Sequence, residues 1–341
     1  MADIFFQHPE PFVEKVRIRP VFIPFMGCPS RCLYCAQWAQ TGQGPRPLEK
    51  TLGQARADLR EARATGREPM ELGFFGGTFT AMKDGWPERF LELAREYREL
   101  GMVTRVRCST RPDAVSVAEL KALKEQGLDV IELGIQSFDA RALEKARRGY
   151  PQETAIRSCG IVREAGLGLG IQLLPGMPGV GGREFQKDID MVVRIKPDFV
   201  RLYPCLVLEK TALADRLEQG EYRPWPLSFT VAQLGWALLR LWRTGIPVIR
   251  VGLAPEAEML EQVVAGPWHP AMGHLARGQA LHALIRWHGA CLGRTPKELF
   301  VPGRYLSEVL GHGKMFVPPL EAMDLQRGSI RTWDKPFFLL R

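Results

Sequence analysis

Residues 48–78, LEKTLGQARADLREARATGREPMELGFFGGT, contain one complete helix–strand unit. Apolar residues recur at helical spacing over Leu48–Ala64, and a short, mostly apolar run over Glu71–Phe75 ends at Gly76 and Gly77. A helical period followed by a run of this length is typical of the alternation that builds a parallel sheet. The stretch therefore predicts a chain of the α/β class.

The same alternation continues on both sides of this unit through the first two-thirds of the chain. The predicted strands are Val21–Phe25, Glu71–Phe75, Arg105–Ser109, Val130–Ile135, Leu167–Leu173 and Phe199–Tyr203. The predicted helices are Leu48–Ala64, Trp86–Leu100, Ser116–Gln126, Glu153–Ala165 and Arg183–Lys196. Six βα units are fewer than the eight that close a full barrel. We therefore expect an α/β fold, a partial (β/α)6 TIM-like barrel with a C-terminal extension.

This pattern changes after about residue 209, which suggests three parts. Residues 1–18 form an N-terminal lead-in, residues 19–208 the (β/α)6 core, and residues 209–341 the extension. The extension has helix signals at Phe229–Arg243 and His274–His288 and a strand signal at Val248–Leu253. We expect it to cover the open side of the barrel and to shape the substrate cavity.

Composition is that of a folded, soluble protein. Of the 341 residues, 45% are hydrophobic and 25% are charged, which is close to ordinary globular usage. The first residues lack the layout of a signal peptide, and no apolar segment approaches a membrane span. We therefore expect a cytoplasmic protein without membrane attachment. The net charge of +8 comes from dispersed basic residues, so it serves either an anionic partner or solubility alone.

Three of the seven cysteines, Cys28, Cys32 and Cys35, lie within one short segment. An odd number of cysteines with this clustering favours a metal site in a reducing compartment over a disulfide framework. Three cysteines alone do not complete a tetrahedral zinc site. They do suit a cubane iron–sulfur cluster in which one iron keeps an open position, since four cysteines normally hold such a cluster.

Each predicted strand runs into a loop of unusual composition. In parallel α/β folds the reactive groups gather where strands end and the following loops begin. The six loops read GCPSRCLYC at 27–35, GGT at 76–78, STRPD at 109–113, GIQSFD at 134–139, LPGMPG at 174–179 and YPCL at 203–206. Their convergence predicts a single site at one edge of the sheet.

These loops resemble a known family. The Cys-x3-Cys-x2-Cys spacing, with Tyr34 before the third cysteine, resembles the radical S-adenosylmethionine (SAM) superfamily. The segments GGTFT, STRPDAV, ELGIQSFD, RRGY, LLPGMPG and RLYPCLVLEKTALADRLEQGEY are similar to the radical domain of the Elongator catalytic subunit and its short bacterial relatives. A more distant likeness is to oxygen-independent coproporphyrinogen oxidase. The stronger resemblance covers roughly residues 18–225.

The resemblance implies the cofactors and the reaction. Cys28, Cys32 and Cys35 would hold a [4Fe–4S] cluster, and S-adenosyl-L-methionine would bind the open iron through its amine and carboxylate. Reduction by an electron donor of the flavodoxin or ferredoxin type would cleave this cofactor to a 5′-deoxyadenosyl radical. The radical would abstract hydrogen from a substrate, a small molecule or RNA, that the sequence does not identify, and the oligomeric state is equally open.

The resemblance also implies cofactor-binding residues at the strand ends. Tyr34 would lie against the adenine, the Gly76 and Gly77 backbone would meet the methionyl amine, and Arg148 would meet the carboxylate. Gln172 replaces an acid that some relatives use to contact the ribose, and Thr78 stands where many relatives carry Glu. The full set is Tyr34, Gly76, Gly77, Thr78, Ser109, Arg111, Gln136, Ser137, Arg148 and Gln172.

Several alternatives stay open. A thiol at Cys205 or a phenol at Tyr203 would be able to donate hydrogen to a substrate radical, although a small buried packing role is the more ordinary use of a lone cysteine. The chain has no segment like the acetyltransferase domain of the Elongator subunit, so we do not expect it to carry out uridine carboxymethylation alone. RNA base modification and a non-catalytic iron–sulfur or haem-carrying protein remain the two rival functions.

Overall fold

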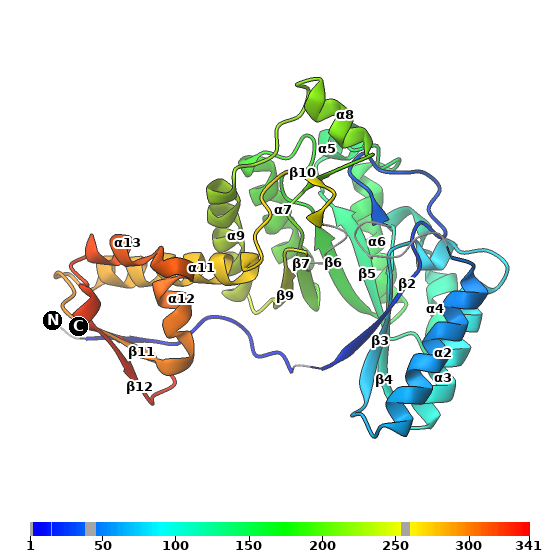
Figure 1. Ribbon diagram of the computed structural model, residues 1–341, viewed down its shortest axis with the longest axis horizontal. Coiled ribbons are helices and arrows are strands. Elements are labelled where there is room, and N and C mark those ends of the chain that lie inside the picture. The colour runs from blue at the N-terminus through cyan, green and yellow to red at the C-terminus, as the bar shows by residue number, and fades with distance from the viewer. Residues whose placement is uncertain (1–2, 15, 38–45, 254–259) are drawn as a thin grey trace. The chain divides into compact units, whose positions relative to one another are not determined.

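The computed structural model describes residues 3–14, 16–37, 46–253 and 260–341. The chain divides into two compact units (Figure 1). The larger unit contains Val13–Pro224 and Leu253–Gly266, and the smaller contains Met1–Phe12, Trp225–Gly252 and Pro267–Arg341. The barrel unit thus continues past residue 208, and the N-terminal residues group with the C-terminal part of the chain.

The larger unit is built on parallel strands that follow one another in chain order. They are β2 (Ile18–Phe22), β3 (Met70–Phe75), β4 (Val103–Thr110), β5 (Val130–Gln136), β6 (Gly168–Leu173) and β7 (Phe199–Leu202). Each strand pairs in parallel with the next, for example Val21 with Phe74 and Phe74 with Cys108. A sheet wound in one direction is the arrangement of a partial barrel, so the predicted fold is confirmed.

The first strand lies three residues earlier than predicted, at Ile18–Phe22 instead of Val21–Phe25. Its sequence, IRPVF, includes a charged residue and Pro20, and therefore has no clean apolar run. Because β2 is a terminal strand of the sheet, the missing amide proton of Pro20 breaks no ladder on a second side. Backbone pairing of Ile18 with Glu71 sets the register.

Helices connect these strands and cover the sheet. They are α2 (Leu48–Ala64), α3 (Trp86–Glu99), α4 (Val117–Glu125), α5 (Ala140–Lys145), α6 (Gln152–Glu164) and α7 (Gly182–Ile195). A further helix, α8 (Ala212–Glu218), follows the last of these strands. The α2, α3 and α4 helices lie side by side along the first strands (Figure 1). Two short antiparallel strands, β8 (Val207–Leu208) and β10 (Val263–Ala265), complete the unit.

The two faces of the parallel sheet differ in chemistry. Leu72 and Phe74 of β3 are fully buried, and the Phe74 ring lies 5.2 Å from that of Phe90 on α3. Side chains alternate along a strand, so Glu71 points to the opposite face. There it forms a buried ion pair with Arg107 of β4. The face away from the helices therefore carries charge, and the candidate site is built on that face.

The smaller unit has its own core. Its helices are α9 (Leu227–Trp242), α11 (Met272–Cys291), α12 (Leu306–Leu310) and α13 (Val317–Glu321), with strand β9 at Val248–Val251. A four-stranded sheet has the order β1 (Ile4–Phe6), β13 (Phe338–Leu340), β11 (Leu299–Pro302), β12 (Ile330–Trp333). The core residues are Phe6, Leu281, Leu284, Ile285, Leu292, Leu299, Val301, Val309, Leu320, Leu325, Phe338 and Leu340.

Throughout the described ranges, each helix is too short or too polar to span a membrane.

Candidate active site

The three clustered cysteines lie in a loop of tight turns that follows β2. The Cys28 amide donates to the carbonyl of Phe25 at 3.1 Å, and the Cys35 amide donates to that of Cys32, also at 3.1 Å. Cys32 is buried, whereas Cys28 and Cys35 are partly exposed. Burial, together with the neighbouring thiols of Cys32 and Cys28, raises the pKa of Cys35 to about 12. The thiols are thus close enough to oppose one another's ionisation.

The glycine motif after β3, residues 76–78, packs against the cysteine loop. The Thr78 amide donates to the carbonyl of Met26 at 2.8 Å, and Thr78 Oγ1 lies 3.2 Å from Cys28 Sγ. A Cβ on Gly77 would lie 2.5 Å from the Met26 carbonyl oxygen and 2.7 Å from that of Ile23. Glycine is therefore required at this position by the cysteine loop itself, independently of any cofactor.

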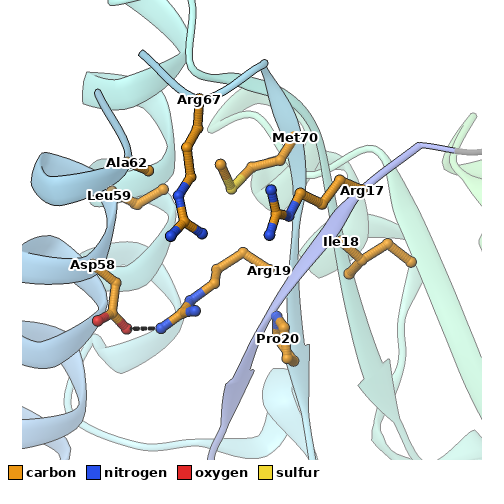
Figure 2. Close-up of a pocket in the computed structure, with 9 residues that line it drawn as sticks. All are labelled: Arg17, Ile18, Arg19, Pro20, Asp58, Leu59, Ala62, Arg67 and Met70. Atoms are coloured by element: carbon orange, nitrogen blue, oxygen red, sulfur yellow. Dashed lines mark hydrogen bonds and ion pairs between the residues drawn. The ribbon is translucent and has the colours of Figure 1, made fainter. Parts of the chain in front are cut away.

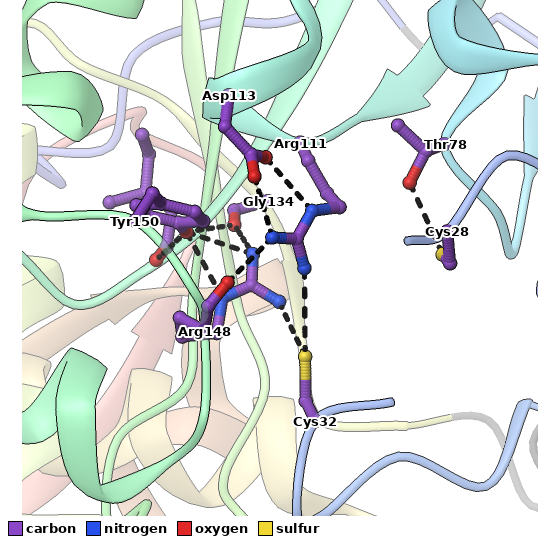
Figure 3. Close-up of polar contacts among 9 residues, drawn as sticks. Cys28, Cys32, Thr78, Arg111, Asp113, Gly134, Arg148 and Tyr150 are labelled. Carbon is purple, nitrogen blue, oxygen red and sulfur yellow. Dashed lines mark hydrogen bonds and ion pairs between the residues drawn. The ribbon is translucent and has the colours of Figure 1, made fainter. Parts of the chain in front are cut away.

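Two buried arginines point at the middle cysteine (Figure 3). Arg148 Nη1 lies 3.0 Å from Cys32 Sγ, and its Nε donates to Tyr150 Oη at 3.0 Å. Arg111 Nη1 lies 4.0 Å from the same sulfur, while its Nη2 pairs with Asp113 at 2.8 Å. A guanidinium beside a sulfur favours the thiolate over the thiol. This corner therefore places two guanidinium groups beside the sulfur of Cys32.

Three residues predicted at the strand ends are joined by a buried polar network. Gln172 Nε2 donates to Ser109 Oγ and to Glu132 Oε2, each at 3.0 Å. Glu132 is fully buried and pairs with Arg201 at 3.0 Å, and Arg201 Nη1 donates to Tyr203 Oη at 3.2 Å. Ser109, Gln172 and Tyr203 therefore share a rigid support on the charged face of the sheet.

Sequence reasoning missed Glu132, Arg201 and Arg107, which binds Glu132 at 3.2 Å. A signal was available for Glu132 and Arg201, because each is the single charged residue of a mostly apolar strand, whereas the strand of Arg107 also contains Arg105. Strands buried on both faces are usually continuous apolar runs. A lone charged residue in such a run indicates an oppositely charged side chain on another strand of the sheet. The sequence of the run does not identify that side chain.

The remaining predicted residues have different surroundings. Tyr34 Oη is buried and has no hydrogen-bond partner among the described residues. Ser137 is fully buried and donates to Asp188 Oδ2 at 2.8 Å, so its hydroxyl supports the loop after β5. Gln136 has a φ of +70°, a left-handed conformation that is uncommon outside glycine. Such a strained residue at a strand end is often functional.

Cys205 follows β7 and is only 2% exposed. Its amide donates to the carbonyl of Pro175 at 2.9 Å, and burial raises the pKa of its thiol to about 12. Tyr222, which contacts Cys205, donates to the carbonyl of Gly176 at 2.7 Å. Tyr203 is more exposed than Cys205, so a reacting group reaches its phenol more readily.

The donor set of this loop fits a cubane cluster. Nowhere in residues 3–14, 16–37, 46–253 and 260–341 do three His, Cys, Asp or Glu side chains converge closely enough to hold one metal ion. A cubane makes no such demand, because each cysteine binds a different iron atom. Three features fit a thiolate-held group in this corner. They are the buried cation at Cys32, the Tyr34 hydroxyl without a partner in the described part of the chain, and the close approach of Gly77 to the cysteine loop.

Comparison with known proteins gives matches over the same segments. The model of the radical SAM superfamily matches residues 22–192, which is half of the chain, and that of the radical SAM C-terminal domain matches residues 197–280. The structure of Methanocaldococcus infernus Elp3 with an N-terminal deletion superimposes with a TM-score of 0.56. It is 21% identical, covers 82% of this chain and is itself covered to 64%. That likeness concerns the fold.

Two curated proteins with similar sequences have different activities. A tRNA uridine(34) acetyltransferase of Methanocaldococcus infernus is 27% identical over 237 residues, 58% of this chain and 44% of the relative. The heme chaperone HemW of Bacillus subtilis is 24% identical over 204 residues, 59% of this chain and 53% of the relative. This chain spans about half the length of the curated relatives it matches. The superfamily match begins at the end of β2 and contains the three-cysteine loop, the glycine motif and both arginines. On that basis the chain belongs to the radical SAM superfamily.

Proposed function

We propose that Cys28, Cys32 and Cys35 hold a [4Fe–4S] cluster and that S-adenosylmethionine binds beside it. The observation that carries the proposal is the three-cysteine loop seated on Gly77, with the Arg148 guanidinium 3.0 Å from Cys32 Sγ. When bound, the pair supplies a one-electron cleavage of a carbon–sulfur bond and a carbon radical that abstracts hydrogen from the substrate.

The chain's own residues hold and orient these groups. Arg148 and Arg111 supply positive charge at Cys32, where three thiolates would otherwise repel one another. Tyr34 offers a buried ring beside the same loop, and its hydroxyl has no hydrogen-bond partner within the described residues. The other cofactor-binding residues in this proposal are Gly76, Gly77, Thr78, Ser109, Gln136, Ser137 and Gln172, all on the loops after β3–β6 or at the ends of those strands.

Tyr203 and Cys205 are proposed to act on the substrate radical. Tyr203 is fixed through Arg201 to the same network that holds Gln172, which places it on the charged face of the sheet. If either residue donates hydrogen, Tyr203→Phe or Cys205→Ala will still cleave S-adenosylmethionine but will not convert the substrate. A variant that retains both reactions excludes that residue as the donor.

The test is anaerobic reconstitution with iron and sulfide, followed by dithionite and S-adenosylmethionine. We expect about four irons per chain and formation of 5′-deoxyadenosine. The bound iron and the formation of 5′-deoxyadenosine will both be lost in each of Cys28→Ala, Cys32→Ala and Cys35→Ala. Both will be retained in Cys291→Ala, which changes an exposed cysteine. A fully loaded protein that forms no 5′-deoxyadenosine with several reductants would contradict the proposal.

RNA is a second candidate for the substrate class. Its support is the similarity to tRNA uridine(34) acetyltransferases and the net charge of +8. The test is binding of a transfer RNA transcript as ionic strength rises, because phosphate contacts release counterions and weaken steeply with salt. Absence of binding at low salt would exclude this candidate.

Two further proposals accompany the radical reaction itself. We propose that an electron donor of the flavodoxin or ferredoxin type reduces the cluster, and that the protein is located in the cytoplasm.

A carrier role is the other candidate, favoured by the similarity to a heme chaperone. It predicts haem binding by the reconstituted protein and no cleavage of S-adenosylmethionine. Formation of 5′-deoxyadenosine in step with conversion of a substrate would exclude it.

A further inference from the structure

Three arginines surround a cavity at the start of β2, in the larger unit. The cavity has a volume of about 140 Å³ and lies between β2, α2 and the start of β3. The guanidinium groups of Arg17, Arg19 and Arg67 all turn toward the same space (Figure 2). The remaining lining residues are Ile18, Pro20, Asp58, Leu59, Ala62 and Met70.

The positive charge of this cavity is only partly compensated. Asp58 pairs with Arg19 and also accepts a hydrogen bond from Gln54 Nε2 at 2.9 Å, so its carboxylate is already engaged. Arg19 Nε is buried and lacks a hydrogen-bond partner within the described residues. Arg17 and Arg67 form no ion pair with any carboxylate in the described part of the chain. Three cations therefore face one carboxylate, which leaves the space attractive to an anion.

The donor arrangement selects the kind of anion. Each guanidinium presents a planar fork of N–H groups that matches the oxygens of phosphate or carboxylate. Two of the forks come from the start of β2 and the third from the loop between α2 and β3. Forks that approach from two sides suit a tetrahedral group with oxygens on several sides better than a flat carboxylate. The volume holds one such group with some water, since a single water needs only about 10–15 Å³.

We propose that Arg17, Arg19 and Arg67 form a binding site for a phosphate group. Arg19 and Cys28 are nine residues apart in the chain. An extended chain spans at most about 3.6 Å per residue, so the site lies within about 32 Å of the cysteine loop. A nucleic acid bound at the strand ends would be long enough to reach it with its backbone, and a free phosphate would fill it equally well. The proposal does not depend on the reaction proposed above.

The test compares two double variants of the full chain that remove the same charge. Arg17→Gln/Arg67→Gln removes two arginines of the cavity, whose side chains are exposed and carry little of the core. Arg60→Gln/Arg95→Gln removes two exposed arginines of α2 and α3 that do not line the cavity. Arg67→Gln alone serves as a milder variant, and circular dichroism checks that each protein is folded.

One arm measures RNA. A fluorescent RNA stem-loop is titrated by anisotropy at several salt concentrations. We expect the cavity variant to bind on the order of tenfold more weakly than the control at low salt, with the slope of log affinity against log salt reduced by about 1 to 2. The single variant should show about half of this change in slope.

The second arm measures free phosphate. Thermal unfolding is followed in inorganic phosphate and in sodium chloride of equal ionic strength. We expect phosphate to raise the melting temperature of the wild type and of the control by about 2 °C more than that of the cavity variant. A difference in the RNA arm alone assigns the site to a nucleic-acid backbone, and a difference in the phosphate arm alone assigns it to a free phosphate. Equal behaviour of both double variants in both arms would overturn the proposal.

Discussion

Arg148 Nη1 lies 3.0 Å from Cys32 Sγ, and the guanidinium is held there by Tyr150 Oη and the carbonyl of Gly134 (Figure 3). All of these groups are buried, so solvent screens the cation only weakly. A hydrogen bond from a cation to a cluster ligand stabilises the more negative, reduced state. In the proposed cluster site, Arg148 would therefore set part of the reduction potential.

Removing that cation will lower the midpoint potential. A charge-assisted hydrogen bond contributes about 1.5–3 kcal/mol, which for one electron corresponds to about 60–130 mV. We expect a shift of this size in Arg148→Gln, and a smaller one in Arg148→Lys, by redox titration followed by electron paramagnetic resonance. Arg147→Gln, at the exposed neighbour, should leave the potential unchanged. An unshifted potential in a cluster-loaded Arg148→Gln would contradict this role.

A methyl group at Gly77 will destabilise the larger unit. Its Cβ would meet two backbone carbonyl oxygens of the cysteine loop at 2.5 and 2.7 Å, and backbone yields less readily than a side chain. We expect Gly77→Ala to lose about 1–3 kcal/mol of unfolding free energy in urea denaturation. Gly53→Ala is the matched control, because it lies in α2 with open space around it and should gain up to about 1 kcal/mol. Equal effects at both glycines would refute the close approach.

The partial barrel could be predicted from the sequence because its signals are local. The helical period of α2 and the apolar run of β3 reflect which face each residue buries. Because this pattern lies within a single helix or strand, it can be recognised from the sequence. The cysteine loop was equally readable, since three cysteines at close spacing leave few chemical uses. The loops after the strands then followed from the geometry of parallel sheets.

What the sequence did not reveal depends on contacts between distant segments. The N-terminal β1 pairs with β13 near the other end of the chain, so no local pattern assigns residues 1–12 to the smaller unit. Glu132 meets Arg201 across two strands of the sheet. Its fully buried position only becomes visible once the strands are placed. The buried charges that support the strand ends were therefore missed, whereas the roles of the residues predicted at those ends stay a prediction.

Neutralising Glu132 will destabilise the larger unit strongly. Its loss leaves Arg107 and Arg201 buried without their shared partner, and breaking a buried pair in this way costs about 3–5 kcal/mol. We expect Glu132→Gln to show this loss in urea denaturation, while the exposed Glu164→Gln changes little. Adding Arg201→Gln should recover part of the loss, because it removes a buried cation whose ion pair is gone, whereas Arg107 keeps its ion pair with Glu71. Strict additivity of the two substitutions would contradict a direct coupling.

Asp188 gives the larger unit a pH-dependent stability. Burial raises the pKa of this carboxyl from 3.8 to about 7, although the Phe138 amide and the Ser137 hydroxyl donate to it. The folded protein therefore binds the proton more tightly than the unfolded chain does. Its contribution is fully present below about pH 4 and is lost as the pH rises to about 7. The slope is at most about 1.4 kcal/mol per pH unit.

The variant Asp188→Asn mimics the protonated carboxyl and cannot ionise. We expect its free energy of unfolding to increase relative to that of the wild type as the pH rises from about 4 to about 7. The difference should grow no further above about pH 7, where Asp188 of the wild type is ionised in both states. Glu164→Gln, at an exposed carboxyl on α6, should run parallel to the wild type over the same range. If Asp188→Asn also runs parallel, Asp188 is ionised in the folded protein throughout, and its hydrogen bonds from Phe138 and Ser137 outweigh the cost of burial.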